Sequence, residues 1–356
     1  MNRLLSQYTI TQATHVGVVR SINGNGPNII ERLSAHRIAV YAVLHAGLAR
    51  GHRANPAATL RVEKLYGLSV LLSGMASLVL SNSEEAILDQ HYKVHLQRLL
   101  KLNQATPAPV VYFLSGCLPL RAHLHIRMFT LFGQLCRLRD GDNILARQAI
   151  TIYSSSCTYP KSWFWKIRLL CLQYGLPHPA SWIMSKPSKV QVKSMIRSAV
   201  TNYWLVNLHA HAVSLSSLRY LRTNYLGLTR CHPMFIFCGS STWEVEKVLL
   251  QARLLSGRFC IEALSGHWVS WNKDGLCTLP EGWNTPDKHK GTVEEFLLSC
   301  SSLSPTRRSL SPLLDTFMSS NPDLAIIIIE CLSADPVQFW LDCSTMLPVI
   351  IAVHLF

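Results

Sequence analysis

Charged residues are scarce in this chain of 356 residues, and acidic ones especially so. Charged side chains make up only 15% of the sequence, while hydrophobic side chains make up 49%. A chain stays disordered when it has too little apolar surface to bury, and this composition is the opposite case. The length also exceeds what one hydrophobic core normally serves. We therefore expect a folded protein with two or three packed subregions.

Long apolar runs are lacking as well. The longest purely aliphatic run is Leu324 to Ile329, whereas a bilayer-spanning helix needs about 20 apolar residues. Residues 1–14 are polar and contain no apolar core of a secretory signal. The 11 cysteines, an odd number in mostly apolar surroundings, resemble reduced thiols rather than a disulfide framework. We expect an intracellular protein, nuclear or cytoplasmic, with no membrane partner.

Known catalytic motifs are also absent from the sequence. It contains no Asp-Asp pair of the kind that holds two metal ions in a polymerase palm. A phosphate-binding loop, a His-Glu-x-x-His helix and a Gly-x-Ser-x-Gly elbow are missing too. His123 with His125, and His209 with His211, stand two residues apart, which puts each pair on different faces of a helix. We expect no enzymatic activity and no small-molecule substrate.

The sequence does hold an uneven excess of positive charge. Residues 1–273 contain 30 Lys and Arg against 10 Asp and Glu, a net charge of +20. Residues 274–356 contain 4 against 10, a net charge of −6. A basic surface attracts polyanions because each phosphate contact releases condensed counterions. Nucleic acid is therefore the first candidate partner, and a role of the charge in solubility alone is the alternative.

Helical periodicity dominates the hydrophobic pattern, and no strand-rich or repeat-like segment stands out. We expect helices over 29–48, 63–80, 84–104, 162–174, 187–208 and 243–256, with others over 292–299, 306–319 and 322–344. Ser83 is the expected N-cap of the third helix. The Asn23–Pro27 segment, rich in Asn and Gly, should not be helical. The predicted fold class is mostly all-α, with a small irregular segment near the C-terminus.

The segment 187–208 is the clearest amphipathic element. Its apolar side presents four residues: Val192, Met195, Ala199 and Tyr203. Another side carries a row of four cations at spacings of three, four and four: Lys186, Lys189, Lys193 and Arg197. Like charges in one row repel each other, so the row does not serve the stability of the helix. A phosphate backbone would account for it.

Other residues extend this candidate nucleic-acid surface. Five further cations are candidates for phosphate contacts: Lys93, Arg98, Lys101, Arg219 and Arg222. In the helix over 84–104, Lys93, Gln97 and Lys101 share the polar side. Trp163, Trp165 and Trp204 would stack bases if exposed, although most are expected in the core because tryptophan is highly buried on average. Binding should tolerate different sequences and depend strongly on salt.

One metal-like constellation lies near the C-terminus. Cys277 and Cys300 bracket His289 and Glu295 in the most polar part of the chain. A structural zinc ion normally takes four ligands, commonly Cys and His, and only two thiols stand here. We favour two unrelated cysteines over a zinc site because the ligand count falls short, and we expect no cofactor.

Short motifs follow one another in a characteristic order along nearly the whole chain. They are Thr14–Val18, His45–Leu48, Arg53–Pro56, Lys64–Tyr66, Ser73–Met75, Ser115–Pro119, His123–His125, Ser162–Phe164, Leu176–Pro179, Ser216–Tyr220, Cys231–Met234, Trp243–Lys247 and Arg253–Arg258. This order resembles the region that follows the polymerase palm in reverse transcriptases of non-LTR (LINE-type) retrotransposons.

The resemblance implies a thumb-derived and post-polymerase region, which grips template RNA and target DNA in an intact protein. It places residue 1 after the catalytic palm and the endonuclease, so reverse transcription is not expected of this chain. The family's Cys-Cys-His-Cys zinc module would fall on Cys277 and Cys300, with Gly282 at the second cysteine position and Glu295 at the histidine position. Two of its four ligands are thus lost.

Five segments follow from this comparison. We expect an irregular leading segment over 1–28, a thumb-like helical region over 29–150, a basic helical linker region over 151–257, a degenerate CCHC-like module over 258–303 and a helical tail over 304–356. The main hypothesis is a non-catalytic fragment that binds RNA or DNA. The alternatives are a decayed transposon-derived coding fragment without selected activity, with exposed apolar faces, and a helical protein-interaction scaffold.

Overall fold

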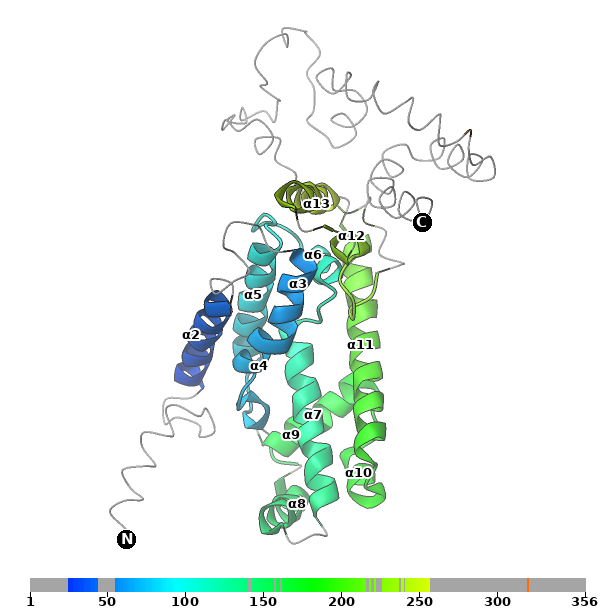
Figure 1. Cartoon of the computed structure of the whole chain (residues 1–356). Helices are drawn as coiled ribbons and strands as arrows, with labels where there is room; N and C mark the ends of the chain where they lie inside the picture. Colours follow the sequence, from blue (N-terminus) through cyan, green and yellow to red (C-terminus); the bar gives the residue numbers. More distant parts are fainter. Residues whose placement is uncertain are drawn as a thin grey trace, which may run out of the picture.

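The computed structural model describes residues 25–43, 55–139, 143–156, 158–160, 162–215, 226–236, 238–239 and 241–256, together with the single residues 218, 221 and 319. Within these ranges all regular secondary structure is helical, as Figure 1 shows. The mostly all-α prediction is confirmed at this level. The predicted zinc-module-like segment and nearly all of the C-terminal tail lie outside the described residues.

The helices follow one another through short connections. In chain order they are α2 (Gly26–Val43), α3 (Pro56–Val62), the π-helix η2 (Glu63–Gly67), α4 (Leu68–Leu71), the 3₁₀ helix η3 (Met75–Ser77), α5 (Asn82–Leu99), α6 (Ala108–Ser115), α7 (Leu120–Leu138), α8 (Ile144–Ser156), α9 (Trp163–Tyr174), α10 (Pro179–Ser185), α11 (Lys189–Val213), α12 (Pro233–Ile236) and α13 (Thr242–Leu255). None of the helices in the described ranges combines the length and the apolar character needed to cross a bilayer.

Helices α7 and α11 form the long axis of the molecule and lie side by side in Figure 1. The buried stripe of α11 is Val192, Ile196 and Val200, each at most 2% exposed. Gly133 on α7 permits the close approach, because a Cβ atom there would lie 2.9 Å from Val192 Cγ1. Of the predicted apolar side, Val192 is buried as expected. Met195, Ala199 and Tyr203 are only half-buried, because the buried side of the helix is rotated toward Ile196 and Val200.

Capping residues set the boundaries of the best-predicted helices. Ser188 and Gln191 form a capping box that starts α11, so Lys186 lies before the helix. Ser81, not Ser83, caps α5: its hydroxyl accepts the Glu84 backbone N–H, and the Glu84 carboxylate accepts the Ser81 N–H. A Ser-x-x-Glu pair satisfies two helix-end donors at once, which explains why the earlier serine prevails.

The largest departure from the predicted helices is the segment 63–80, which is not one helix. Five residues of π-helix open it, α4 ends at Leu71, and Gly74, in the left-handed region with φ of 73°, precedes the 3₁₀ helix η3. Helix α2 also begins at Gly26, inside the segment that was predicted to be irregular. Gln97, predicted on the polar side of its helix, is 1% exposed because its Nε2 donates to the carbonyls of residues 103, 104 and 106.

The three tryptophans expected mostly in the core are half-buried, and Trp163 and Trp204 pack against the core. Trp163 is half-buried and its indole N–H donates to the Ala76 carbonyl at 2.8 Å. Trp204 is also half-buried, and its N–H donates to the Tyr174 hydroxyl at 3.2 Å. Trp165 is covered in part by the Arg168 guanidinium, 5.6 Å from its ring centre. The five cysteines within the described ranges are free thiols, in agreement with the reduced state expected from the sequence.

Candidate nucleic-acid interface and a buried histidine cluster

An open groove runs along one face of α11. It is lined by Lys189, Val190, Lys193, Ser194, Arg197, Ser198, Thr201, Asn202 and Thr229. The structure therefore brings three of the predicted phosphate contacts together in one hollow. All three cations are exposed, and the lining contains no carboxylate. With a rise of 1.5 Å per residue, the three stand about 6 Å apart along the helix axis.

One histidine near the groove is uncharged. His123 on α7 is a neighbour of Arg197, and burial, together with the charges of Lys64, Arg127 and Arg197, lowers the pKa of His123 to about 3. The imidazole is therefore uncharged near neutral pH. The positive potential of this face comes from permanently charged Lys and Arg side chains.

The remaining predicted cations occupy other places. Lys186 is the exposed C-cap of α10, in the left-handed conformation with φ of 45°, and does not line the groove. Lys93 and Arg98 lie on α5. Lys101 holds α13, because its Nζ contacts Glu246 Oε1 at 3.3 Å and its carbonyl accepts from Arg253 Nε at 2.9 Å.

Arg219 and Arg222 lie outside the described residues, as do the predicted metal ligands Cys277, His289, Glu295 and Cys300. The predicted nucleic-acid surface therefore divides into a group of three on α11 and scattered cations elsewhere. The spacing of four residues between Lys189, Lys193 and Arg197 is the sequence pattern that predicted this group. Lys93 and Lys101 were predicted from the polar side of the helix over 84–104, and neither lines the groove.

On α5, the buried carboxylate of Glu85 is the centre of a network of polar side chains. Glu85, 2% exposed, contacts Lys166 Nζ at 2.8 Å, Arg121 Nε at 3.1 Å and His125 Nε2 at 3.4 Å. Burial alone would raise the pKa of Glu85, but the hydrogen bonds and charges of His125 and Lys166 outweigh burial and lower it. This explains His125, which the sequence had offered only as half of a histidine pair.

The same network continues to α11. Tyr174 lies 2.7 Å from His125 Nδ1 and accepts the indole N–H of Trp204. The Glu85 carboxylate can only accept, so His125 carries its proton on Nε2 and donates it to Glu85. The unprotonated Nδ1 of His125 then accepts the hydroxyl proton of Tyr174. The groove-bearing helix is thus joined through four side chains to α5.

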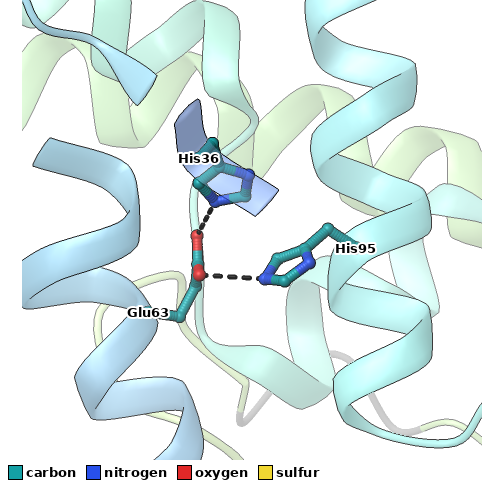
Figure 2. Close-up of side chains that lie close together, drawn as sticks. All are labelled: His36, Glu63 and His95. Atoms are coloured by element: carbon teal, nitrogen blue, oxygen red, sulfur yellow. Dashed lines mark hydrogen bonds and ion pairs between the residues drawn. The ribbon is translucent and has the colours of Figure 1, made fainter. Parts of the chain in front are cut away.

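A second buried cluster joins three elements on the other side of the bundle (Figure 2). Glu63, the first residue of the π-helix, accepts from His36 Nε2 of α2 at 3.0 Å and from His95 Nε2 of α5 at 2.9 Å. The side chains of His36 and Glu63 are fully buried, and that of His95 is 9% exposed. His36 Nδ1 also lies 3.3 Å from His91 Nε2.

The environment of Glu63 keeps it ionised. Burial alone would raise its pKa, but the hydrogen bonds from His36 and His95 outweigh burial and lower it to about 2. Gly67 makes room for the carboxylate, since a Cβ atom at that position would collide with Glu63 Oε2. Sequence reasoning missed this cluster because its members stand 27 and 32 residues apart. The one local signal was His91 and His95, four residues apart on one helix.

Comparisons of the chain with protein-family models, with curated proteins and with solved structures found no match.

Proposed function

We propose that the groove on α11 binds the phosphate backbone of RNA or DNA in a non-catalytic role. The observation that carries this proposal is the placement of Lys189, Lys193 and Arg197, all exposed, in one groove without a carboxylate. Each cation that meets a phosphate releases condensed counterions, which drives binding with little regard to sequence. Permanent positive charge on a helix face has no comparable use in the stability of the helix.

The uncharged groove residues suit the same ligand. Ser194, Ser198 and Thr201 offer hydroxyl groups, and Asn202 offers an amide, all of which donate to phosphate oxygens in protein complexes with nucleic acid. No tryptophan, tyrosine or phenylalanine lines the groove, so the described site has no platform for stacking bases. We therefore expect phosphate contacts to supply the affinity and little discrimination between sequences.

We propose further that the chain derives from the post-palm region of a non-LTR reverse transcriptase. Two of the motifs that suggested this origin meet in space. The backbone N–H of His232, in the motif Cys231–Met234, donates to the Leu114 carbonyl at 2.9 Å, beside the motif Ser115–Pro119. Gly116 lies so close to Arg230 that a Cβ atom there would overlap its carbonyl. This contact supports reading the motifs as parts of one structural unit.

The test of the proposed function is a charge reversal in the groove. In the variant Lys189→Glu, Lys193→Glu, Arg197→Glu, we expect weaker binding to labelled RNA and duplex DNA, measured by fluorescence anisotropy over a salt series. The slope of log affinity against log salt should fall by roughly 2 for single strands and roughly 3 for a duplex, since three phosphate contacts are removed.

A matched control separates the groove from net charge. The variant Arg37→Glu, Arg61→Glu, Lys247→Glu changes the charge by the same amount at exposed positions on α2, α3 and α13. It should keep most of the affinity and slope of the wild-type chain. Equal losses in both variants, or none in the groove variant, would refute the assignment of binding to α11.

Exposed apolar side chains favour a second candidate, a protein-interaction scaffold. Val213 and Met184 are 83% exposed and Leu172 is 71% exposed, on α11, α10 and α9. A contiguous apolar patch marks protein-interaction sites, and these side chains are the candidates to form one. This candidate would replace the first if the chain bound a protein partner at high salt, equally well in the groove variant, and showed no affinity for RNA or DNA.

A further inference from the structure

We propose that His36, Glu63 and His95 form a binding site for one zinc ion, which joins α2, the π-helix and α5. The three side chains offer two imidazole nitrogens and one carboxylate oxygen, and these atoms all lie within 4.8 Å of one another. Two His and one Glu are an established zinc ligand set, with the fourth position left to water. This site is separate from the groove on α11.

The ligand chemistry selects the metal. Calcium and magnesium prefer oxygen ligands and would find only one carboxylate here. Neutral imidazole with one carboxylate suits zinc, and no cysteine takes part in the cluster. Glu63 supplies the carboxylate whose negative charge a buried divalent cation requires.

The two histidine–carboxylate distances are close to those between ligand atoms of a metal site. The Glu63 oxygens are 3.0 Å from His36 Nε2 and 2.9 Å from His95 Nε2. Ligand atoms about 2.1 Å from a tetrahedral zinc ion stand roughly 3.3 Å apart. The two N–H···O bonds would therefore lengthen by roughly 0.4 Å as metal bonds replace them. Figure 2 shows both rings directed at the carboxylate from different helices.

A proton relay behind His36 allows the exchange. In the empty site His36 Nε2–H donates to Glu63, and His36 Nδ1, 3.3 Å from His91 Nε2, accepts from it. When Nε2 binds the ion, its proton leaves to solvent, the His91 Nε2 proton moves to His36 Nδ1, and His91 takes up a proton from solvent on its own Nδ1, so that His36 then donates to His91. His95 likewise exchanges its Nε2 proton for one on Nδ1. Each ring keeps one proton throughout. A ligating histidine commonly donates its other N–H in this way, which orients the ring.

The place of the cluster in the fold points to an ion held in the interior between helices. Glu63 opens a π-helix, a distortion found frequently at functional sites, and Gly67 is the small residue that admits its side chain. The three ligands come from three elements that pack on each other. Only the His95 side chain has any exposure, 9%, so the ion would enter from that side and remain enclosed.

Cobalt substitution tests the site on the whole chain. After treatment with a chelator, Co²⁺ should bind with the visible absorption of a four-coordinate centre and without the near-ultraviolet bands of a cobalt–thiolate bond. One equivalent of Zn²⁺ should abolish the spectrum, and Zn²⁺ should raise the melting temperature. If the folded wild-type chain shows no such spectrum, or only one with thiolate bands, the proposal is wrong.

Variants locate the ion. Glu63→Gln and His95→Gln should lose stoichiometric binding, and His91→Phe should weaken zinc affinity about 10-fold to 100-fold, as is usual for residues that orient a ligand. His211→Gln, at an exposed position of α11, should bind like the wild type. The paired variant Cys277→Ser, Cys300→Ser should also keep the spectrum, and its loss there would assign the metal to the C-terminal segment.

If Glu63→Gln does not fold, the wild-type spectrum and His91→Phe still decide the question. Unchanged affinity in His91→Phe would count against the proposal. RNA binding measured on the same samples is independent of the result, because the cluster contributes nothing to the groove.

Discussion

Glu85 places a negative charge in the interior beside two permanent cations. A buried ion pair costs little while it is complete, but the removal of one partner leaves the other charge without compensation. We predict that Glu85→Gln lowers the free energy of unfolding by about 3 kcal/mol in urea titrations, because Lys166 loses its ion partner in the interior, whereas Arg121 keeps Asp89 at 3.4 Å.

The matched control for this prediction is Glu246→Gln. Glu246 pairs with Lys101, and both side chains are more than a third exposed. Solvent screens such pairs, so the loss should be below about 1 kcal/mol. Similar decreases in the free energy of unfolding in the two variants would show that the buried ion cluster stabilises the fold no more than an exposed ion pair does.

At the scale of the helices, the contact between α7 and α11 depends on a missing side chain. Alanine normally stabilises a helix relative to glycine by about 1 kcal/mol, yet a Cβ atom at Gly133 would press on Val192. We predict that Gly133→Ala is destabilising by about 1 to 2 kcal/mol, the usual cost of overpacking. The double variant with Val192→Ala should be less destabilised than the sum of the two singles in thermal unfolding. Additive losses would contradict this reading.

The helices also show how far sequence can lead. Ser162 and Ser188 were flanked by clear periodicity, so α9 and α11 were predicted within a few residues. The π-helix was not, because no local pattern in the sequence marks it, and its first residue Glu63 bonds to histidines far along the chain. The groove on α11 followed from a row at helical spacing. The buried cluster required knowledge of which helices meet, which composition and spacing do not contain.

The whole molecule should be sensitive to acid well before its carboxylates are all protonated. Burial lowers the pKa of His123 to about 3 and the pKa values of His91 and His232 to about 4. The unfolded chain takes up these protons near pH 6.5, so it binds more protons than the folded chain below that pH. Asp89 acts in the opposite sense, because burial raises its pKa to about 6.

We therefore predict that stability falls as pH is lowered from about 6.5 to 4, with three histidines outweighing one aspartate. Glu63 adds a further loss below about pH 4.5, because its pKa is lowered to about 2. Urea midpoints measured at several pH values test this. His123→Gln should reduce the slope, and a flat profile between pH 6.5 and 4 would show that these histidines titrate normally in the folded state.

The connection from Trp204 through Tyr174 and His125 to Glu85 has one more consequence. Helix α11 is held by a stripe of buried aliphatic residues and by this hydrogen-bonded chain. Its cations therefore stand at fixed intervals along a rigid helix. The nucleic acid, and not the helix, must then change its conformation on binding. A flexible single strand can match the spacing of its phosphates to these cations more readily than a stiff duplex can. Single-stranded RNA is therefore the form expected to fit best.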